Sequence, residues 1–328
     1  MPIGVDSGYK NYSGPVSSYL TSNPTSYIAP VFSAKTLKKF YAATVLNEIT
    51  STEYLGEIKD VGDTVIITTD PDVQIKNYQK GMDLELDYYE SPAFALTIKY
   101  AKYFNFGIDD VDNKQMFIKR MDAWAENAAK RMKITIEQEL FSLYAADSLT
   151  LTPDPANVGT NAGKKSGNIN LGTSTAPVGV NRNNVLDYFV FINQVLDEQD
   201  VPDDGSRYIV IPAWMASMLK LSDLKDASIT GLGESILLNG RLGKIDNITI
   251  YKSNLLPTGT ATVGGNEVTY TVIPFGHKNG LAFVTQLTKV ETYRPEKKFM
   301  NAIKGLQVYG FEIVYPQLVG KLIAYKNE

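Results

Sequence analysis

The side chains that could support catalysis are few and scattered in this sequence. The chain has no cysteine and a single histidine, His277, which excludes disulfides, thiolate metal sites and any site built from two histidine ligands of this chain. Histidine acid–base chemistry would have to run through His277 alone, and its place between two strand-like runs favours a turn residue. The serines have neither a second histidine nor an adjacent lysine motif to activate them.

Two glycine-rich segments share only part of the pattern of a nucleotide-binding loop. Residues 159–166, Gly-Thr-Asn-Ala-Gly-Lys-Lys-Ser, are one residue short of the phosphate-loop spacing, and no predicted strand or helix flanks them. Residues 231–243 hold four glycines without the dinucleotide-binding pattern, and they lead into a strand instead of following one. We therefore interpret the first segment as a flexible surface loop and the second as turns.

An alternating segment offers the remaining candidate chemistry. In residues 82–88 the acids occupy one face of a predicted strand, namely Asp83, Glu85 and Asp87, and the apolar side chains occupy the other. Such a face could bind a cation, because hard cations take carboxylate oxygens. A solvated face, or one that meets lysines of a neighbouring chain, is the preferred interpretation. We predict no cofactor and no metal.

The elements around these residues are unusually long. Residues 1–30 resemble an extended arm, residues 32–50 have a helical pattern, and residues 52–100 read as a two-stranded excursion with a turn at Asp70 and Pro71. An isolated hairpin is marginal in water, so its apolar face is expected to rest on another chain. Residues 112–146 follow a period of 3.6, which predicts a helix of roughly 50 Å at ~1.5 Å per residue.

The remainder mixes shorter helices and strands. We predict a loop over 149–184, a helix capped by Asn184, a strand over 207–211 and a helix after Pro212. Further strands are predicted at 248–251, 268–273, 281–285 and 306–324. This order predicts an α+β protein with antiparallel strands, segregated helices and no βαβ unit.

Composition narrows the class of protein. The chain has 328 residues, of which 44% are hydrophobic, and a net charge of −4. These values exclude a wholly disordered chain and argue against a dedicated nucleic-acid binder. The start of the chain lacks a signal-peptide pattern and no apolar run approaches the ~20 residues of a membrane span, so we expect a soluble, non-secreted protein.

Four pairs of sequence segments, taken in their order along the chain, resemble segments of a known protein family. They are 32–45 with 56–65, 104–112 with 136–140, 196–212 with 240–254, and 290–295 with 305–312. Their shared order, spread over residues 32–325, resembles the major capsid proteins of tailed bacteriophages with the Hong Kong 97-like fold. That fold has an N-terminal arm, a long two-stranded extended loop, a long spine helix, and peripheral and axial domains.

The resemblance implies a division of the chain into five parts. These are an arm with a short helix (1–51), the extended β-hairpin loop (52–103), the spine helix and loop of the peripheral domain (104–182), the axial domain (183–270), and closing strands of both domains (271–328). The residues expected at assembly interfaces are Lys35, Lys38, Lys39, Asp70, Pro71, Lys76, Lys80, Asp83, Glu85 and Asp87.

The resemblance also implies a role without catalysis. The chain would self-assemble into hexamers and pentamers of an icosahedral or prolate head that encloses double-stranded DNA, which it would contact weakly and non-specifically. Its partners would be its own copies together with scaffold, portal and decoration proteins. It would be made in the cytoplasm of a bacterial host, would reside in the virion and would contact no membrane.

Three other readings stay open at this point. An encapsulin-like compartment shell would share the fold but would need a pocket for a cargo peptide, which no residue pattern marks. A β-rich surface or filament protein is disfavoured by the missing signal peptide. An enzyme would depend on His277 and the acidic segment alone.

Overall fold

The computed structural model describes residues 44–51, 64–68, 73–84, 86–91, 93–111, 121–145, 153–222 and 243–327. All of them belong to one unit, Phe40–Glu328. The mixture of helices and strands confirms the predicted α+β class. The predicted arm lies outside the described residues, and of the helix predicted over 32–50 the structure describes α2 (Leu46–Ile49).

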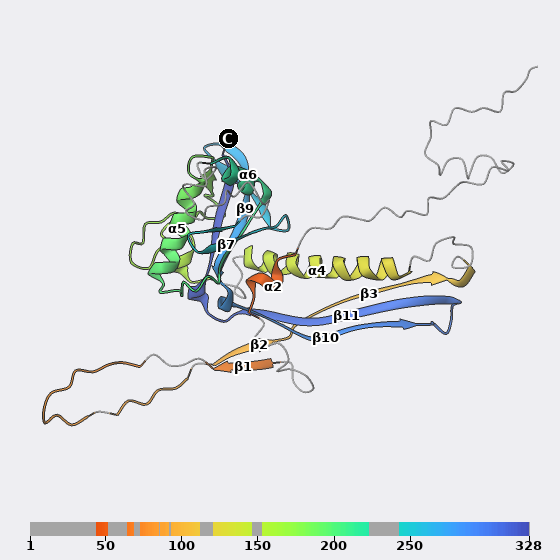
Figure 1. Ribbon diagram of the computed structural model, residues 1–328, viewed down its shortest axis with the longest axis horizontal. Helices are drawn as coiled ribbons and strands as arrows, with labels where there is room; N and C mark the ends of the chain where they lie inside the picture. Colours follow the sequence, from red (N-terminus) through yellow and green to blue (C-terminus); the bar gives the residue numbers. More distant parts are fainter. Residues whose placement is uncertain are drawn as a thin grey trace, which may run out of the picture. The chain divides into compact units, whose positions relative to one another are not determined.

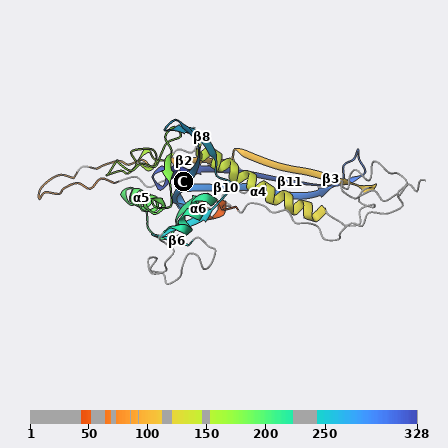
Figure 2. The same cartoon turned by 90° about the horizontal axis from the view of Figure 1, so that it is seen from above.

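A long antiparallel sheet carries the longest described helix. Its strand order is β10 (Leu281–Tyr293), β11 (Met300–Ile313) and β3 (Tyr100–Asp109). The helix α4 (Met121–Ala145) runs along β3 and β11 in both Figure 1 and Figure 2. Its 25 residues span roughly 37 Å at ~1.5 Å each, which confirms the predicted helix over 121–145; residues 112–120 lie outside the described part.

The buried face of α4 differs in detail from the predicted stripe. Ile136 and Leu140 are buried as predicted, and Phe141 and Tyr144 join them. Trp124, predicted on the same stripe, is 41% exposed and contacts the ring of Phe106 only edge-on. The core therefore covers the C-terminal half of α4, where both larger sheets are within reach.

A second, seven-stranded sheet contains most of the remaining strands. Its order is β4 (Val178–Val180), β12 (Val319–Lys326), β9 (Asn266–His277), β5 (Arg207–Ile211), β7 (Ile248–Lys252) and β6 (Lys244–Ile245), with β8 (Thr258–Val263) paired to β9. Two helices, α5 (Val185–Glu198) and α6 (Ala213–Leu221), pack against each other and contribute to the same core.

The prediction of an antiparallel sheet without a βαβ unit is wrong. Strands β5 and β7 pair in parallel with α6 between them in the chain, and β4 pairs in parallel with β12. A parallel pair needs a crossover, and α6 supplies one. The sequence concealed this unit because residues 223–242 separate α6 from β7 by a long glycine-containing stretch.

Two predicted strands also need correction. The strand predicted over 306–324 is two strands, because β11 ends at Ile313 and a short turn over Pro316–Leu318 precedes β12. The strand predicted over 82–88 is absent from the described residues 82–84 and 86–88. Alternation defines two faces, but a strand also requires a backbone partner. Among the described residues of the excursion, backbone pairing is found where β1 (Thr64–Thr68) meets β2 (Ala93–Thr97).

Helix α5 begins at the predicted residue, but the hydrogen bonds that Asn184 makes there differ from the predicted helix cap. The side chain of Asn184 makes no cap hydrogen bond to the helix. Its Oδ1 instead accepts from the Asn181 N–H at 2.7 Å, and its Nδ2 donates to the carbonyl of Gly179 at 3.0 Å. Asn184 therefore fixes the turn before the helix.

A buried arginine ties the end of α5 to the start of β5. The Arg207 side chain is 1% exposed, and its Nη1 lies 2.7 Å from Asp197 Oδ1 and 2.5 Å from Asn193 Oδ1. Its Nη2 donates to the carbonyl of Val201 at 2.5 Å and its Nε to that of Pro202 at 3.2 Å. A buried guanidinium that donates to four acceptors holds the intervening turn in one conformation.

We predict that Arg207→Ala lowers the free energy of unfolding by about 3–5 kcal/mol, because the buried acceptors of Asn193 and Val201 lose their donor. Guanidinium chloride unfolding followed by circular dichroism measures the change. The matched control is Lys130→Ala on the exposed face of α4, which we expect to cost at most ~0.5 kcal/mol. Equal effects of the two substitutions would contradict the role assigned to Arg207.

Candidate assembly surface

The excursion between β1 and β2 exposes apolar side chains along its length. The described residues 73–84 and 86–91 have no helix or strand, and all are exposed. Ile75 is 93% exposed and Tyr88 is 89% exposed. The other large apolar side chains exposed there are Val73, Tyr78, Met82, Leu84, Leu86 and Tyr89. Contiguous apolar exposure of this kind marks an interaction surface.

The structure brings together two of the residues predicted at interfaces. Lys76 Nζ lies 2.8 Å from Asp87 Oδ1, which links the two sides of the excursion. This hydrogen bond to Lys76 is the main cause that lowers the pKa of Asp87. Lys80 and Asp83 are exposed and take no part in that pair. The remaining predicted residues lie outside the described part of the chain: Lys35, Lys38, Lys39, Asp70, Pro71 and Glu85.

The acidic row proposed as a possible cation site is not formed as a strand face. Asp87 is engaged by Lys76 of the same chain. Within the described ranges, no three acidic or histidine side chains gather closely enough to hold a metal ion. The excursion is therefore characterised by its apolar side chains, with the acids interspersed among them.

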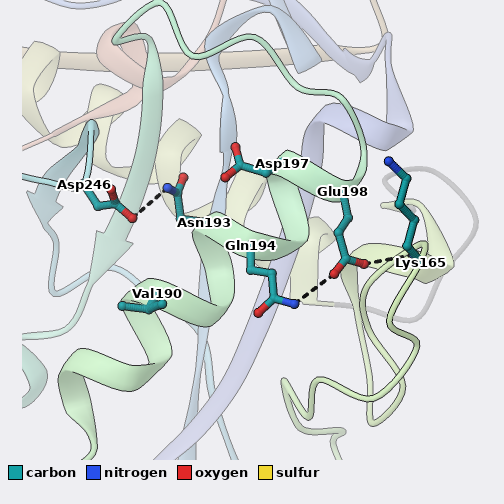
Figure 3. Close-up of a pocket in the computed structure, with 7 residues that line it drawn as sticks. All are labelled: Lys165, Val190, Asn193, Gln194, Asp197, Glu198 and Asp246. Carbon is teal, nitrogen blue, oxygen red and sulfur yellow. Dashed lines mark hydrogen bonds between the residues drawn. The ribbon is translucent and has the colours of Figure 1, made fainter.

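A hollow of about 320 Å³ beside α5 is the second candidate (Figure 3). Four of the polar side chains that line it are bonded to one another or to the backbone, namely Asn193, Gln194, Glu198 and Asp246, and Asp197 pairs with Arg207. Asn193 Nδ2 donates to Asp246 Oδ2 at 2.7 Å, and Gln194 Nε2 donates to Glu198 Oε1 at 2.9 Å. Such mutually satisfied groups hold α5 against its neighbours and leave no poised acid or base.

The glycine-rich loop at 159–166 is held by the carboxylate of Glu198, which also lines the hollow. Glu198 Oε2 accepts the backbone N–H groups of Lys165 and Ser166, each at 2.9 Å. The Ser166 N–H is the main cause that lowers the pKa of Glu198 to about 2. The backbone of Ala162, which is fully buried, pairs with Ile169. The prediction of a surface loop is confirmed, because residues 160, 161 and 164–166 are exposed and belong to no helix or strand. Glu198 anchors this loop and occupies the backbone N–H groups of Lys165 and Ser166, which a phosphate would need.

His277 ends β9 and caps the short turn Lys278–Gly280, in agreement with the turn interpretation. It is nevertheless 2% exposed. Its Nδ1 accepts the N–H of Asn279 at 3.2 Å, so its Nε2 carries the proton and donates to Asp204 Oδ1 at 3.0 Å. The Ser206 N–H and then His277 lower the pKa of Asp204 to about 2. Both ring nitrogens of His277 thus serve structure.

Sequence reasoning missed a buried carboxylate on α4. Glu137 is fully buried, and its Oε2 accepts the N–H groups of Val45 at 2.7 Å and Leu46 at 3.2 Å. Burial raises its pKa, and these hydrogen bonds oppose the shift. Its spacing to Phe141 and Tyr144, four and seven residues on, was the available signal, because it places the acid on an apolar helix face. Glu137 fixes the chain where it enters the folded body.

We predict that Glu198→Gln makes the protein less stable at pH 7 and that this difference disappears as the pH falls to about 2. The pKa of Glu198 is lowered from 4.5 to about 2, so its ionised form stabilises the fold above pH 4.5 and loses that contribution between these values. Urea unfolding at a series of pH values measures it.

The matched control for this series is Glu267→Gln, which alters an exposed side chain of β9. We expect the control to leave stability unchanged across the range. A difference for Glu198→Gln that persists undiminished at pH 2 would contradict the role of its charge.

Comparisons with known proteins match this chain to capsid proteins of phages. A family model described as "Phage capsid protein" matches residues 91–317. A comparison with curated protein sequences finds no significant match.

Among the described helices, none combines the length and the apolar character needed to cross a bilayer.

Solved structures share the fold at low sequence identity. A chain of "Mycobacterium phage Che8" matches with a TM-score of 0.69 and 22% identity, over 92% of this chain and 97% of that one. A chain from the capsid of cyanophage P-SCSP1u matches with a TM-score of 0.65 and 15% identity, over 97% and 100%. The mature capsid of bacteriophage PhiM1 gives a TM-score of 0.66 and 13% identity, over 90% and 92%.

Proposed function

This chain belongs to the phage capsid protein family, and we propose that it forms the hexamers and pentamers of an icosahedral or prolate head that encloses double-stranded DNA. Family membership assigns it a structural role in the capsid of a virion. The observation that supports self-assembly is the run of exposed apolar side chains over residues 73–89, which no element of the same chain covers within the described residues.

The finer architecture is proposed in the terms of the Hong Kong 97-like fold. The long sheet with α4 would be the peripheral domain, and the seven-stranded sheet with α5 and α6 would be the axial domain. The domain limits predicted after residues 103 and 270 fall within β3 and β9. We propose to assign each of these strands as a whole to one domain, because a paired strand is one structural unit.

The energetic argument concerns the excursion. In a free subunit its leucines, isoleucine and tyrosines face water, and burying one such side chain fully is worth about 1.5–3 kcal/mol. Contact with a second subunit would recover this energy and offset the conformational entropy lost by the unpaired segment. Folding and assembly would then draw on different side chains.

The other partners follow from the same role. We propose that scaffold, portal and decoration proteins act with this chain, and that it is made in the cytoplasm of a bacterial host. A net charge of −4 favours weak, non-specific contact with packaged DNA, since a basic excess would bind phosphates tightly.

Negative-stain electron microscopy of the expressed chain, with light-scattering mass on the same sample, tests the proposal. Closed particles, or rings of five or six subunits, would support it. A monomer of 36.2 kDa that stays monomeric at high concentration and with a scaffold protein would overturn it. Particles from the native source that hold a protein cargo and no DNA would favour the encapsulin-like alternative.

We predict that the double substitution Leu84→Ser and Leu86→Ser abolishes particle formation and leaves the stability of the subunit within ~0.5 kcal/mol of the wild type. The two leucines are 78% and 76% exposed, so the fold of one chain does not use them. Particle yield by sedimentation and unfolding by urea give the two readouts. The control is Gln79→Ser on the same excursion, which should assemble normally; loss of assembly in the control would contradict the apolar mechanism.

A further inference from the structure

Glu137 is a buried acid without a basic partner among the described residues. Its side chain is fully buried, and it accepts hydrogen bonds from the N–H groups of Val45 at 2.7 Å and Leu46 at 3.2 Å and from Ser253 Oγ at 3.3 Å. Within the part of the chain that the structure describes, no lysine, arginine or histidine forms an ion pair with it. Hydrogen bonds alone offset only part of the cost of burying a charge.

The contact lies where the chain enters the folded body. Figure 1 shows α2 beside α4. The two N–H groups that Glu137 accepts belong to the start of α2, whose N-cap residue, Val45, supplies no side-chain cap. A carboxylate of a distant helix thus takes the place of a local cap. Because α2 is a single turn, it depends on such contacts for its position.

A second anchor holds the other end of this short segment. The N–H of Ser51 donates to the carbonyl of Leu281 at 2.8 Å, and the carbonyl of Ser51 accepts the N–H of Phe283 at 3.2 Å. These are backbone hydrogen bonds to β10 and carry no titratable group. Of the two anchors, only the contact with Glu137 can therefore respond to a proton.

The other titratable groups around Glu137 do not set its charge. Burial comes first among the causes that act on its pKa, followed by its three hydrogen bonds, and no charged side chain is among them. Burial also raises the pKa of the surrounding tyrosines, so they stay neutral. The titratable and charged residues on the elements packed there are Glu48 of α2, Glu139 and Tyr144 of α4, Tyr208 of β5, Tyr251 and Lys252 of β7, Tyr309 of β11 and Lys321 of β12.

The direction of the effect follows from the burial of the acid. Burial raises the pKa of Glu137 above its ordinary value of 4.5, and the hydrogen bonds from Val45, Leu46 and Ser253 oppose the shift. The folded state therefore binds this proton more tightly than a state in which the carboxyl group is in water. The stabilising contribution of the neutral form is fully present below pH 4.5 and is lost as the pH rises through the raised pKa.

We propose that Glu137 is a proton-dependent anchor for residues 45–50: its neutral side chain holds this segment against α4, and its ionisation loosens the segment. Ser51 stays paired with β10 in both states and is the fixed end of the movement. This inference is independent of the proposed function, because it concerns one chain and needs no partner.

Hydrogen exchange followed by mass spectrometry tests the anchor in the full chain. After correction for the intrinsic pH dependence of exchange, we expect the protection factor of peptides covering residues 44–50 to fall at least about threefold from about pH 5 to about pH 8. Peptides covering the buried strand β5 are the internal control and should keep a constant protection factor. A constant protection factor over residues 44–50 would overturn the inference and leave the proposed function standing.

Glu137→Gln separates the proton from the shape of the side chain. This variant cannot ionise, so its protection over residues 44–50 should not change with pH. The matched control is Glu48→Gln, which removes an exposed carboxylate of α2 itself and should keep the wild-type response. A fall of equal size in Glu137→Gln and in the wild type would contradict the role of this proton.

Ser253→Ala provides a test that leaves Glu137 in place. The substitution removes a hydrogen bond that lowers the pKa of Glu137. The loss of protection over residues 44–50 should therefore move to higher pH than in the wild type. A loss at the wild-type pH, or at lower pH, would contradict the proposed anchor.

Discussion

The C-terminal half of α4 is the point at which the separate parts of this chain are joined. Tyr144 donates its hydroxyl proton to the carbonyl of Gly320 at 2.6 Å, which binds the helix to the seven-stranded sheet. One turn earlier, Phe141 lies in a core that also contains side chains of β10, β11, β5 and β12. Glu137 holds the entering chain through Val45 and Leu46. This half of the helix therefore packs into a core to which both larger sheets contribute.

Close packing at this junction leaves little room for variation. At Gly320 a Cβ atom would lie 2.3 Å from the ring of Phe275 and 2.8 Å from the carbonyl oxygen of Asn157, so a larger residue would force one of these buried groups to shift. The Arg207 side chain is equally constrained, because its guanidinium donates hydrogen bonds to acceptors on each side of the turn that it fixes. The folded body encloses its own hydrophobic core, while the excursion between β1 and β2 leaves its apolar side chains in water. A subunit of a larger shell needs both features: a body that folds on its own, and exposed apolar side chains that can contact a neighbouring subunit.

Periodicity gave reliable information where one element buries its own face. The helix over 121–145, the buried strand over 207–211 and the helix after Pro212 follow from local pattern and punctuation. Local pattern failed where the outcome depends on a distant partner. Residues 82–88 alternate like a strand but lack a paired backbone among the described residues, and β5 pairs with β7 in parallel across a long intervening stretch. The loop at 159–166 is ordered by Glu198, more than thirty residues away.

The sequence by itself determined the inventory and the lengths: no cysteine, one histidine, an oversized helix and an acidic, apolar excursion. Those features exclude disulfides, thiolate metal sites and sites with two histidine ligands, and they favour assembly. They can be recognised without a structure, because residue type and spacing are local properties. Tertiary structure alone decided which charged groups are engaged, since Lys76 meets Asp87, Arg207 meets Asp197, and Glu137 meets Val45 only through folding. It also decided that the hollow beside α5 is acidic, because that hollow gathers residues that are far apart in the chain.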